Sequence, residues 1–367
     1  MNSSNSAILL LEDGTYFTGT AIGKKGTTFG EITFNTGMTG YQEVFTDPSY
    51  YGQISVMTTA HIGNYGSHPN ENESEKIMIA GLVTKKFSKT YSRTSANESI
   101  NDKMIASECV GIADVDTRAL VRYVRHKGAM NAAISSEILD VEELKKLLEK
   151  VPSMEGLELS SKVTTKEKFT VKAENSQFKV ALIDFGVKQN IIRCLNDRGC
   201  DVTVFPMNTT LDEIKAMNPD GIMLSNGPGD PAAMIQPLEL VQQLKTLNLP
   251  IFGICMGHQL LGLSYNLKTV KMQNGHRGIN HPVVNFVTGK CEVTSQNHGF
   301  VISDESVQNN QEIEVTHRHL NDNTVAGISV KNKPIFSVQY HPEASAGPHD
   351  SRYLFDQFIE NMKSKVN

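Results

Sequence analysis

One short stretch, residues 249–263, constrains this chain more than any other. Its first part, residues 250–254, is an apolar run typical of a buried parallel strand, and an apolar helical pattern follows. Gly253 and Gly257 flank Cys255, and small residues at these spacings let the chain turn sharply from strand to helix. Such a turn lifts the central side chain above the edge of a sheet. The N-terminus of the following helix then favours a thiolate over a thiol.

A cysteine nucleophile needs a base, and the base needs a group that orients it. Residues 336–343 offer both, because an apolar run ends in His341 and Glu343. Residues two apart on an extended segment point the same way, so we expect Glu343 to hold the imidazole while its other nitrogen faces Cys255. A lone cysteine is usually a small buried hydrophobe, and His341 with Glu343 alone would suggest a solvated strand end. Their joint occurrence favours a catalytic triad.

These two segments resemble the class I, or triad, glutamine amidotransferases. The pattern Gly-x-Cys-x-Gly-x-Gln of that family matches residues 253–259, and its His-Pro-Glu matches residues 341–343. In that family the cysteine attacks the side-chain amide of glutamine and releases ammonia. The resemblance covers roughly the second half of the chain and implies L-glutamine as the substrate.

Length and composition set the outer bounds. A chain of 367 residues favours two domains, each able to bury a core. The formal net charge of -5 does not indicate binding to nucleic acid or to a membrane surface. No apolar run approaches the length of a membrane span. Five cysteines without a CxxC pair argue against disulfides and against a zinc site, so we expect no metal. The N-terminus does not read as a secretory signal, and a reducing, cytoplasmic setting is the simplest expectation.

Residues 1–150 are predicted to form one α+β domain rich in strands, beginning with a hairpin. The segment 35–50 is dense in Gly, Thr and Pro and predicts a loop rather than a core element. An amphipathic helix is predicted over residues 141–150 with Asp140 as its N-cap. A second helix is predicted over residues 115–125. It carries three basic side chains, which form either a solvated face or part of a docking surface: Arg118, Arg122 and Arg125.

Three segments of this domain are similar to the N-terminal domain of the small, glutamine-hydrolysing subunits of carbamoyl-phosphate synthetase. They are residues 35–50, residues 61–66, and residues 111–118 with 128–131. Other class I amidotransferases do not share that domain, so the two halves extend the resemblance over almost the whole chain. The resemblance implies a ligase subunit that hydrolyses glutamine and delivers ammonia for arginine and pyrimidine biosynthesis.

The rest of the chain divides into a linker and an α/β domain. Residues 151–178 hold Pro, Gly, Ser, Thr and a Lys-Glu run with little periodicity, which predicts a linker. Over residues 179–367 strands alternate with helices, which predicts a mainly parallel sheet flanked by helices on both faces. Sites in such sheets lie at the carboxyl ends of strands. Residues 226–229 and Cys255 both occupy such ends, one crossover apart.

Amide hydrolysis also needs donors for the tetrahedral oxyanion. The backbone N–H of Met256 is well placed as one donor, while Gly227 and Gly229 let the neighbouring strand end approach closely. The resemblance implies that the backbone N–H of Gly229 is the second oxyanion donor. It also carries glutamine-binding roles onto Ser49, Gln259, Asn297, Gly299 and Phe300. By spacing alone, residues 297–300 are only a turn. His258 is interpreted as a structural helix residue, since His341 already fills the role of the base.

The chain shows no P-loop and no ATP-grasp site, yet carbamoyl phosphate synthesis needs ATP. The resemblance therefore implies a heterodimer, with no cofactor in this chain and with ATP, bicarbonate and metal ions on a large partner subunit. Two alternatives remain. The first is the glutaminase of another synthetase, such as that for anthranilate or GMP, against which the N-terminal domain argues. The second is a non-catalytic regulatory subunit, against which the intact Cys255, His341 and Glu343 argue.

Overall fold

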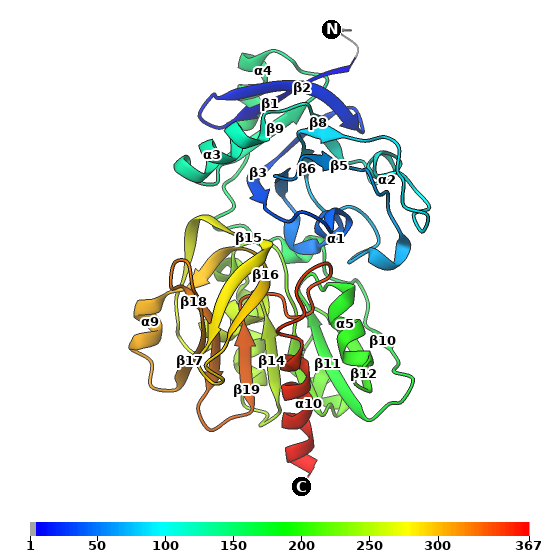
Figure 1. Ribbon diagram of the computed structural model, residues 1–367. Coiled ribbons are helices and arrows are strands. Elements are labelled where there is room, and N and C mark those ends of the chain that lie inside the picture. Colours follow the sequence, from blue (N-terminus) through cyan, green and yellow to red (C-terminus); the bar gives the residue numbers. More distant parts are fainter. Residues whose placement is uncertain (1–4, 367) are drawn as a thin grey trace. The chain divides into compact units, whose positions relative to one another are not determined.

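The computed structural model describes residues 5–366, and the chain divides into two compact units (Figure 1). The first unit takes the residues up to Met154 together with Gln273–Gly278. The second takes Glu155–Met272 and the residues from Ile279 onward. Within the range that the structure describes, no helix is both long and apolar enough to cross a membrane.

The first unit is built on a closed barrel with the strand order β1-β2-β8-β6-β4-β3-β9. The expected N-terminal hairpin is confirmed, since β1 pairs antiparallel with β2, whereas β3, β4, β6 and β8 run parallel. Alternate residues of β1 face opposite ways: Leu9 packs inside the barrel and Leu10 packs against a helix outside it. The strands are β1 Ser6–Leu11, β2 Tyr16–Gly23, β3 Thr27–Asn35, β4 Gln53–Met57, β6 Gly81–Val83, β8 Val110–Ala113 and β9 Asn131–Ser135. A separate small sheet pairs β5 His61–Ile62 with β7 Lys86–Phe87.

Two helices of this unit, α1 and α2, were not predicted from the sequence. The predicted Asp140 cap is confirmed, because its carboxylate accepts from the N–H of Glu143. The segment 35–50 was expected to be a loop, and that was wrong. Gly40, at φ 79°, starts a helix whose Tyr41 and Phe45 are buried one turn apart, so core packing outweighs the turn-rich composition. The helices are α1 Tyr41–Thr46, α2 Ile100–Ala106, α3 Thr117–Lys127 and α4 Val141–Leu148.

The second unit contains a 10-stranded sheet, counted over the described residues, in the order β10-β12-β11-β13-β14-β19-β18-β17-β15-β16. The predicted parallel centre is confirmed, since β12, β11, β13, β14 and β19 all run parallel, and antiparallel strands extend both sides. The strands are β10 Phe169–Val171, β11 Phe178–Asp184, β12 Cys200–Pro206, β13 Gly221–Leu224, β14 Ile251–Ile254, β15 Thr269–Asn285, β16 Cys291–Ile302, β17 Ile313–His319, β18 Val325–Val330 and β19 Ile335–Val338.

Helices cover both faces of this sheet, as the alternation predicts. Ile183 of β11 faces a core that includes Leu260 of α8, whereas Leu182 faces the opposite core with Phe358 of α10. The helices are α5 Gln189–Asn196, α6 Leu211–Met217, α7 Ile235–Leu244, α8 Met256–Ser264, α9 Asp304–Gln308 and α10 Tyr353–Val366.

The segment 151–178, expected to be a linker, contributes to the second unit from Glu155 onward. Its Ser160 is fully buried, and β10 pairs antiparallel with β12 at the edge of the sheet. The segment lacks an apolar period because hydrogen bonds to neighbouring loops, rather than an apolar face, hold much of it in place.

Candidate active site

Cys255 lies at a sharp turn between β14 and α8, with φ 53° and ψ −101°. Positive φ is uncommon for a residue other than glycine, and such strain is a mark of functional sites. The flanking glycines are needed for close approach. A Cβ atom on Gly253 would lie 2.8 Å from the carbonyl oxygen of Gly257, and one on Gly257 would lie 2.3 Å from that of Leu224. The packing therefore imposes the small residues around the cysteine.

His341 and Glu343 meet beyond the end of β19. Nδ1 of His341 lies 2.7 Å from Oε1 of Glu343, and both side chains are buried. The expectation of an extended segment was wrong: His341 forms an isolated bridge with Ser295, and Glu343 follows in a turn. The turn, closed by the N–H of Ala344 donating to the carbonyl of His341, brings the two side chains together.

Two residues at the start of α5 hold Glu343, and the sequence analysis missed both: the N-cap Lys188 and Asn190 in the first turn. Nζ of Lys188 lies 3.0 Å from Oε1 of Glu343, with both side chains almost fully buried. The side-chain amide of Asn190 donates to the carbonyl oxygen of Glu343. A signal was present, because these residues follow β11, which ends at Asp184, at the carboxyl edge of the parallel strands where sites lie.

The electrostatics of this group keep both partners charged. Burial by itself would raise the pKa of Glu343, but the cation of Lys188 and the imidazole of His341 hold it below the ordinary range. Burial by itself would lower the pKa of His341. The carboxylate of Glu343, with help from the thiol of Cys255, outweighs the effect of burial, so the pKa of His341 is raised. Among the described residues, the buried Nε2 of His341 finds no hydrogen-bond partner of ordinary geometry. That nitrogen can carry a proton to and from a reacting group.

The predicted glutamine-binding residues of the second unit surround the cysteine and its helix. Sγ of Cys255 lies 3.6 Å from the carbonyl oxygen of Asn297, and Nε2 of Gln259 donates to the carbonyl of Phe300 at 2.8 Å. Residues 297–300 were expected to be a turn, and that was wrong, because they lie within β16. Gly299 lies in the same strand. Ser49 lies in the first unit, in a 3-10 helix where its N–H donates to the carboxylate of Asp47.

The two expected oxyanion positions lie at neighbouring strand ends. Met256 is the first residue of α8, where backbone N–H groups lack intrahelical acceptors. Gly229 has φ 95°, and Gly227 is packed so closely that a Cβ would lie 2.3 Å from the carbonyl oxygen of Phe185. The carbonyl of Ser225 accepts from the N–H of Gly257 at 2.9 Å, which ties the end of β13 to the start of α8.

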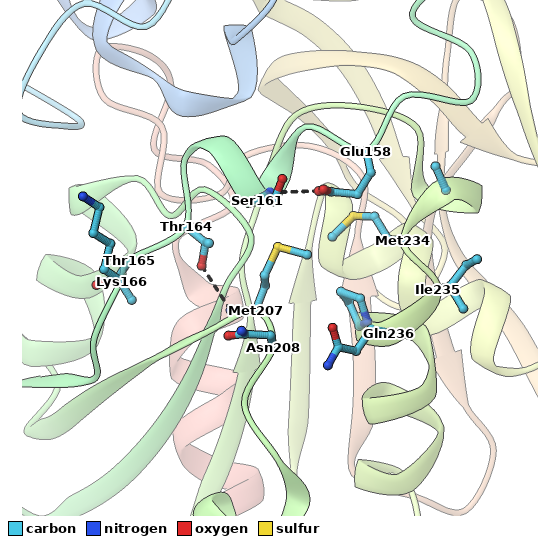
Figure 2. A pocket seen from close by; sticks show the side chains of 12 residues that line it. Glu158, Ser161, Thr164, Thr165, Lys166, Met207, Asn208, Met234, Ile235 and Gln236 are labelled. Carbon is cyan, nitrogen blue, oxygen red and sulfur yellow. Dashed lines mark hydrogen bonds between the residues drawn. The ribbon is translucent and has the colours of Figure 1, made fainter.

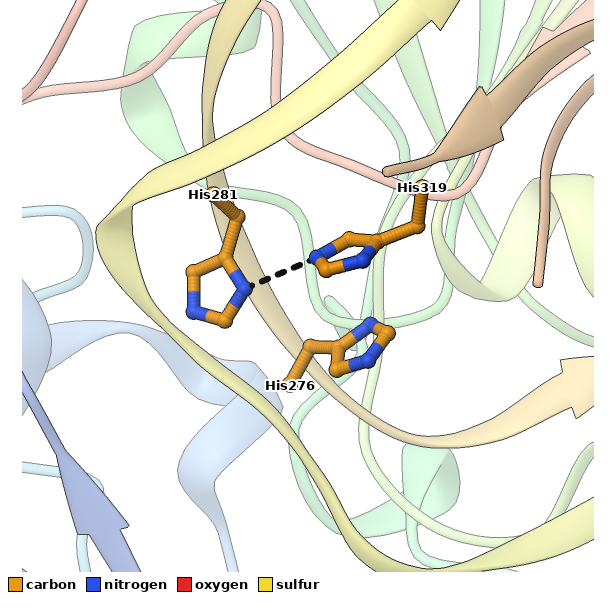
Figure 3. A group of neighbouring side chains, drawn as sticks. All are labelled: His276, His281 and His319. Carbon is orange, nitrogen blue, oxygen red and sulfur yellow. Dashed lines mark hydrogen bonds between the residues drawn. The ribbon is translucent and has the colours of Figure 1, made fainter. Parts of the chain in front are cut away.

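Other histidines of the second unit make hydrogen bonds that tie its elements together. Nδ1 of His258 lies 2.9 Å from Oγ of Ser337, and burial lowers the pKa of His258 to about 3, which leaves it neutral. Nδ1 of His281 lies 3.0 Å from Nε2 of His319 (Figure 3), a contact that links β15 with β17. The third histidine drawn there, His276, belongs to the first unit. We assign none of them a part in the chemistry.

Comparison with known proteins agrees with this site. Residues 181–361 match the model of the class-I glutamine amidotransferase family, and residues 9–134 match that of the carbamoyl-phosphate synthase small chain, CPSase domain. The chain is 50% identical over 363 residues to the carbamoyl phosphate synthase small chain of Chlorobaculum tepidum, covering 98% of this chain and 99% of the relative. The small chain of a Synechococcus strain is 46% identical over 372 residues, covering 98% and 94%. That of Neisseria meningitidis serogroup A is 44% identical over 374 residues, covering 98% and 99%. With both domains matched and half of its residues shared with a full-length relative, the chain belongs to the carbamoyl phosphate synthase small-chain family.

Proposed function

We propose that this chain is the glutaminase subunit of a carbamoyl phosphate synthase, hydrolysing L-glutamine to glutamate and ammonia. The observation that carries the proposal is the elbow at Cys255, next to a buried histidine whose pKa is raised by Glu343, a carboxylate that Lys188 holds ionised. Activated nucleophile, proton carrier and orienting carboxylate are the parts that acyl transfer from an amide needs. Membership of the small-chain family supports the same reaction.

In the first half of the proposed reaction, the thiolate of Cys255 attacks the side-chain carbonyl carbon of glutamine. A C–S bond forms and the carbonyl oxygen becomes an oxyanion, which the N–H groups of Met256 and Gly229 stabilise. His341 then gives its proton to the amide nitrogen as the C–N bond breaks. Ammonia leaves, and a γ-glutamyl thioester remains on Cys255.

In the second half, His341 takes a proton from a water molecule whose oxygen attacks the thioester carbon. The C–S bond breaks, glutamate leaves, and the thiolate of Cys255 and the imidazolium of His341 are restored. Glu343 holds the ring throughout and stabilises its charged form. Ser49, Gly227, Gln259, Asn297, Gly299 and Phe300 are proposed to recognise the α-amino and α-carboxylate groups of glutamine, as the resemblance implies.

A small chain implies a large-subunit partner. We propose that this partner binds ATP, bicarbonate and metal ions, and that it receives the ammonia in a heterodimer serving arginine and pyrimidine biosynthesis. In this proposal the chain itself carries no cofactor. A cytoplasmic location is proposed as well, because a catalytic thiol needs a reducing compartment.

The test is the exchange of one atom. Cys255→Ser in the assembled enzyme should abolish carbamoyl phosphate synthesis from glutamine and leave synthesis from added ammonium intact, since a hydroxyl does not ionise as a thiol does. Cys291→Ser is the matched control, because Cys291 is exposed, and it should leave both activities unchanged. Normal glutamine-dependent turnover in Cys255→Ser would refute the proposal.

A further inference from the structure

We infer that Ser160 and Asp230 are positioning residues for glutamine hydrolysis, because they fix the loop that carries Gly229 to a neighbouring strap. The strap is residues 155–165, and the loop is residues 226–230. The inference rests on the proposed function, in which the N–H of Gly229 faces the oxyanion. It assigns a catalytic purpose to a segment whose sequence suggests only a connection.

The backbone of the strap lies directly against Gly229. Glu158 and Gly229 form an antiparallel bridge. A Cβ atom on Gly229 would lie 2.7 Å from the carbonyl oxygen of Leu157 and 3.0 Å from the nitrogen of Leu159, so the two backbones leave no room for a side chain. Since Gly229 has φ 95°, the strap helps to define the direction of its peptide groups.

Two buried polar side chains fasten the strap on either side of Gly229. Oγ of Ser160 donates to the carbonyl oxygen of Pro228 at 3.2 Å, and Ser160 is fully buried. Oδ2 of Asp230 accepts from the N–H of Gly156 at 2.9 Å, while the N–H of Asp230 donates to the carbonyl of Leu157. The residues before and after Gly229 are therefore both tied to the strap, which constrains the peptide planes between them.

The far end of the strap, Thr164 and Thr165, contacts the turn that leads into Lys188, the residue that pairs with Glu343. Oγ1 of Thr164 donates to the carbonyl oxygen of Asp184, and the N–H of Thr165 donates to its carboxylate at 2.7 Å. The same carboxylate accepts from the N–H groups of Gly186 and Val187, at the turn that leads into Lys188. One segment thus contacts both the proposed oxyanion loop and the turn that presents the partner of Glu343.

Part of the strap borders a cavity, where Oγ1 of Thr164 accepts from the N–H of Met207 at 3.1 Å. Strap residues including Glu158, Ser161 and Thr164 line a cavity of about 550 Å³ together with Met207 and Met234 (Figure 2). A close-packed neighbour would hold a segment in place even after it lost a hydrogen bond. With a cavity there, the hydrogen bonds to the loop carry that burden, so the loss of one should let the strap and Gly229 shift.

The test uses Ser160→Ala in the assembled enzyme with two readouts. Its kcat for glutamine should fall about tenfold or more, with KM nearly unchanged, because a slightly misplaced donor weakens the transition state more than the ground state. Alkylation of Cys255 by iodoacetamide should keep its wild-type rate, since displacement of iodide generates no oxyanion. A merely structural lesion would slow both reactions together.

Ser161→Ala is the matched control at the exposed neighbouring serine, and it should behave as wild type in both assays. Asp230→Asn is the second variant, because it replaces the acceptor facing Gly156 and should repeat the pattern of Ser160→Ala. The inference would be overturned by a wild-type kcat in both Ser160→Ala and Asp230→Asn. It would also be overturned if hydrolysis and alkylation slowed equally in these variants. In either case, an inactive Cys255→Ser would still uphold the proposed function. An active Cys255→Ser would instead remove the proposed function itself.

Discussion

Nζ of Lys188 lies 3.0 Å from Oε1 of Glu343, and the side chains of both residues are at most 5% exposed. The same carboxylate oxygen lies 2.7 Å from Nδ1 of His341. Glu343 therefore faces two cations in a dry environment, where charges interact more strongly than at a surface. This arrangement keeps the carboxylate ionised and the imidazole correctly oriented.

Replacing Lys188 with Met should impair both catalysis and folding. The change leaves Glu343 with only His341 as a charged partner, and breaking a buried ion pair is strongly destabilising. We expect the unfolding free energy to fall by about 3 kcal/mol, the lower end for such pairs, because His341 still faces the carboxylate. Glutamine-dependent kcat should fall as well. Urea unfolding and steady-state kinetics measure the two effects.

Lys172→Met is the matched control for that experiment. Lys172 pairs with Asp201 at 2.7 Å, but its side chain is 73% exposed. Exposed pairs contribute little to stability, so this variant should unfold close to wild type. Similar losses for Lys172→Met and Lys188→Met would mean that burial of the Lys188 pair is irrelevant.

The proposed triad should behave as one unit in double variants. His341→Asn removes the proton carrier and should approach the loss caused by Cys255→Ser. Glu343→Gln weakens orientation and charge stabilisation without removing the carrier, so its loss should be smaller. The effects of replacing residues that act together are strongly non-additive. The double variant with His341→Asn and Glu343→Gln should therefore be little worse than His341→Asn alone. Losses that multiply in the double variant would argue against shared action.

The buried His341–Glu343 pair should make stability depend on pH on both sides. The pKa of Glu343 is lowered from its ordinary 4.5, so its contribution is present above pH 4.5 and is lost as pH falls through the lowered value. The pKa of His341 is raised from its ordinary 6.5, so its contribution is complete below pH 6.5 and is lost as pH rises through the raised value. The gap in unfolding free energy between wild type and Glu343→Gln should therefore be largest between pH 4.5 and 6.5. Denaturant titrations across pH check this, and a constant gap would contradict it.

Local signals in the sequence predicted much of the second unit. The helix Leu211–Met217 carries such a signal, because Thr210 and Glu213 form a capping box at its start. The glycines around Cys255 predicted the elbow, because steric demands at such a turn are local. Where the geometry of a segment depends only on its own residues, the sequence pattern is enough to predict that geometry.

Contacts between distant segments were harder to predict. Lys188 reaches Glu343 across more than 150 positions of sequence, and its place after a strand end marks a site without naming Glu343 as its partner. The strap lacks an apolar period because hydrogen bonds hold much of it, including those from the hydroxyls of Ser160 and Thr164. Asn297 was expected in a turn, although β16 continues through it as the sheet supplies pairing partners. These features depend on tertiary packing, which overrides local composition.

Docking of the large subunit should raise the glutaminase rate. Ammonia is useful only when the synthetase is ready, so the isolated chain should be a slow glutaminase. Coupling between two sites typically amounts to about 1–3 kcal/mol, or roughly 5–150-fold. Glutamate production should be measured with and without the large chain, together with ATP and bicarbonate. A full rate in the isolated chain, with no affinity for the large chain, would contradict the assignment as its subunit.

The exposed face of α3 is our candidate for part of the docking surface in the first unit. It carries three exposed basic side chains, Arg118, Arg122 and Arg125. Their joint reversal to Glu should weaken association with the large subunit, chiefly by slowing encounter, and the wild-type association rate should fall as salt is added. Reversal of three basic residues on α4 and just beyond it, Lys145, Lys146 and Lys150, changes the net charge equally and is the control. Stopped-flow or biosensor association rates separate the two sets. Equal effects would indicate a response to net charge alone, and unchanged binding in the α3 variant would exclude this face as a docking site.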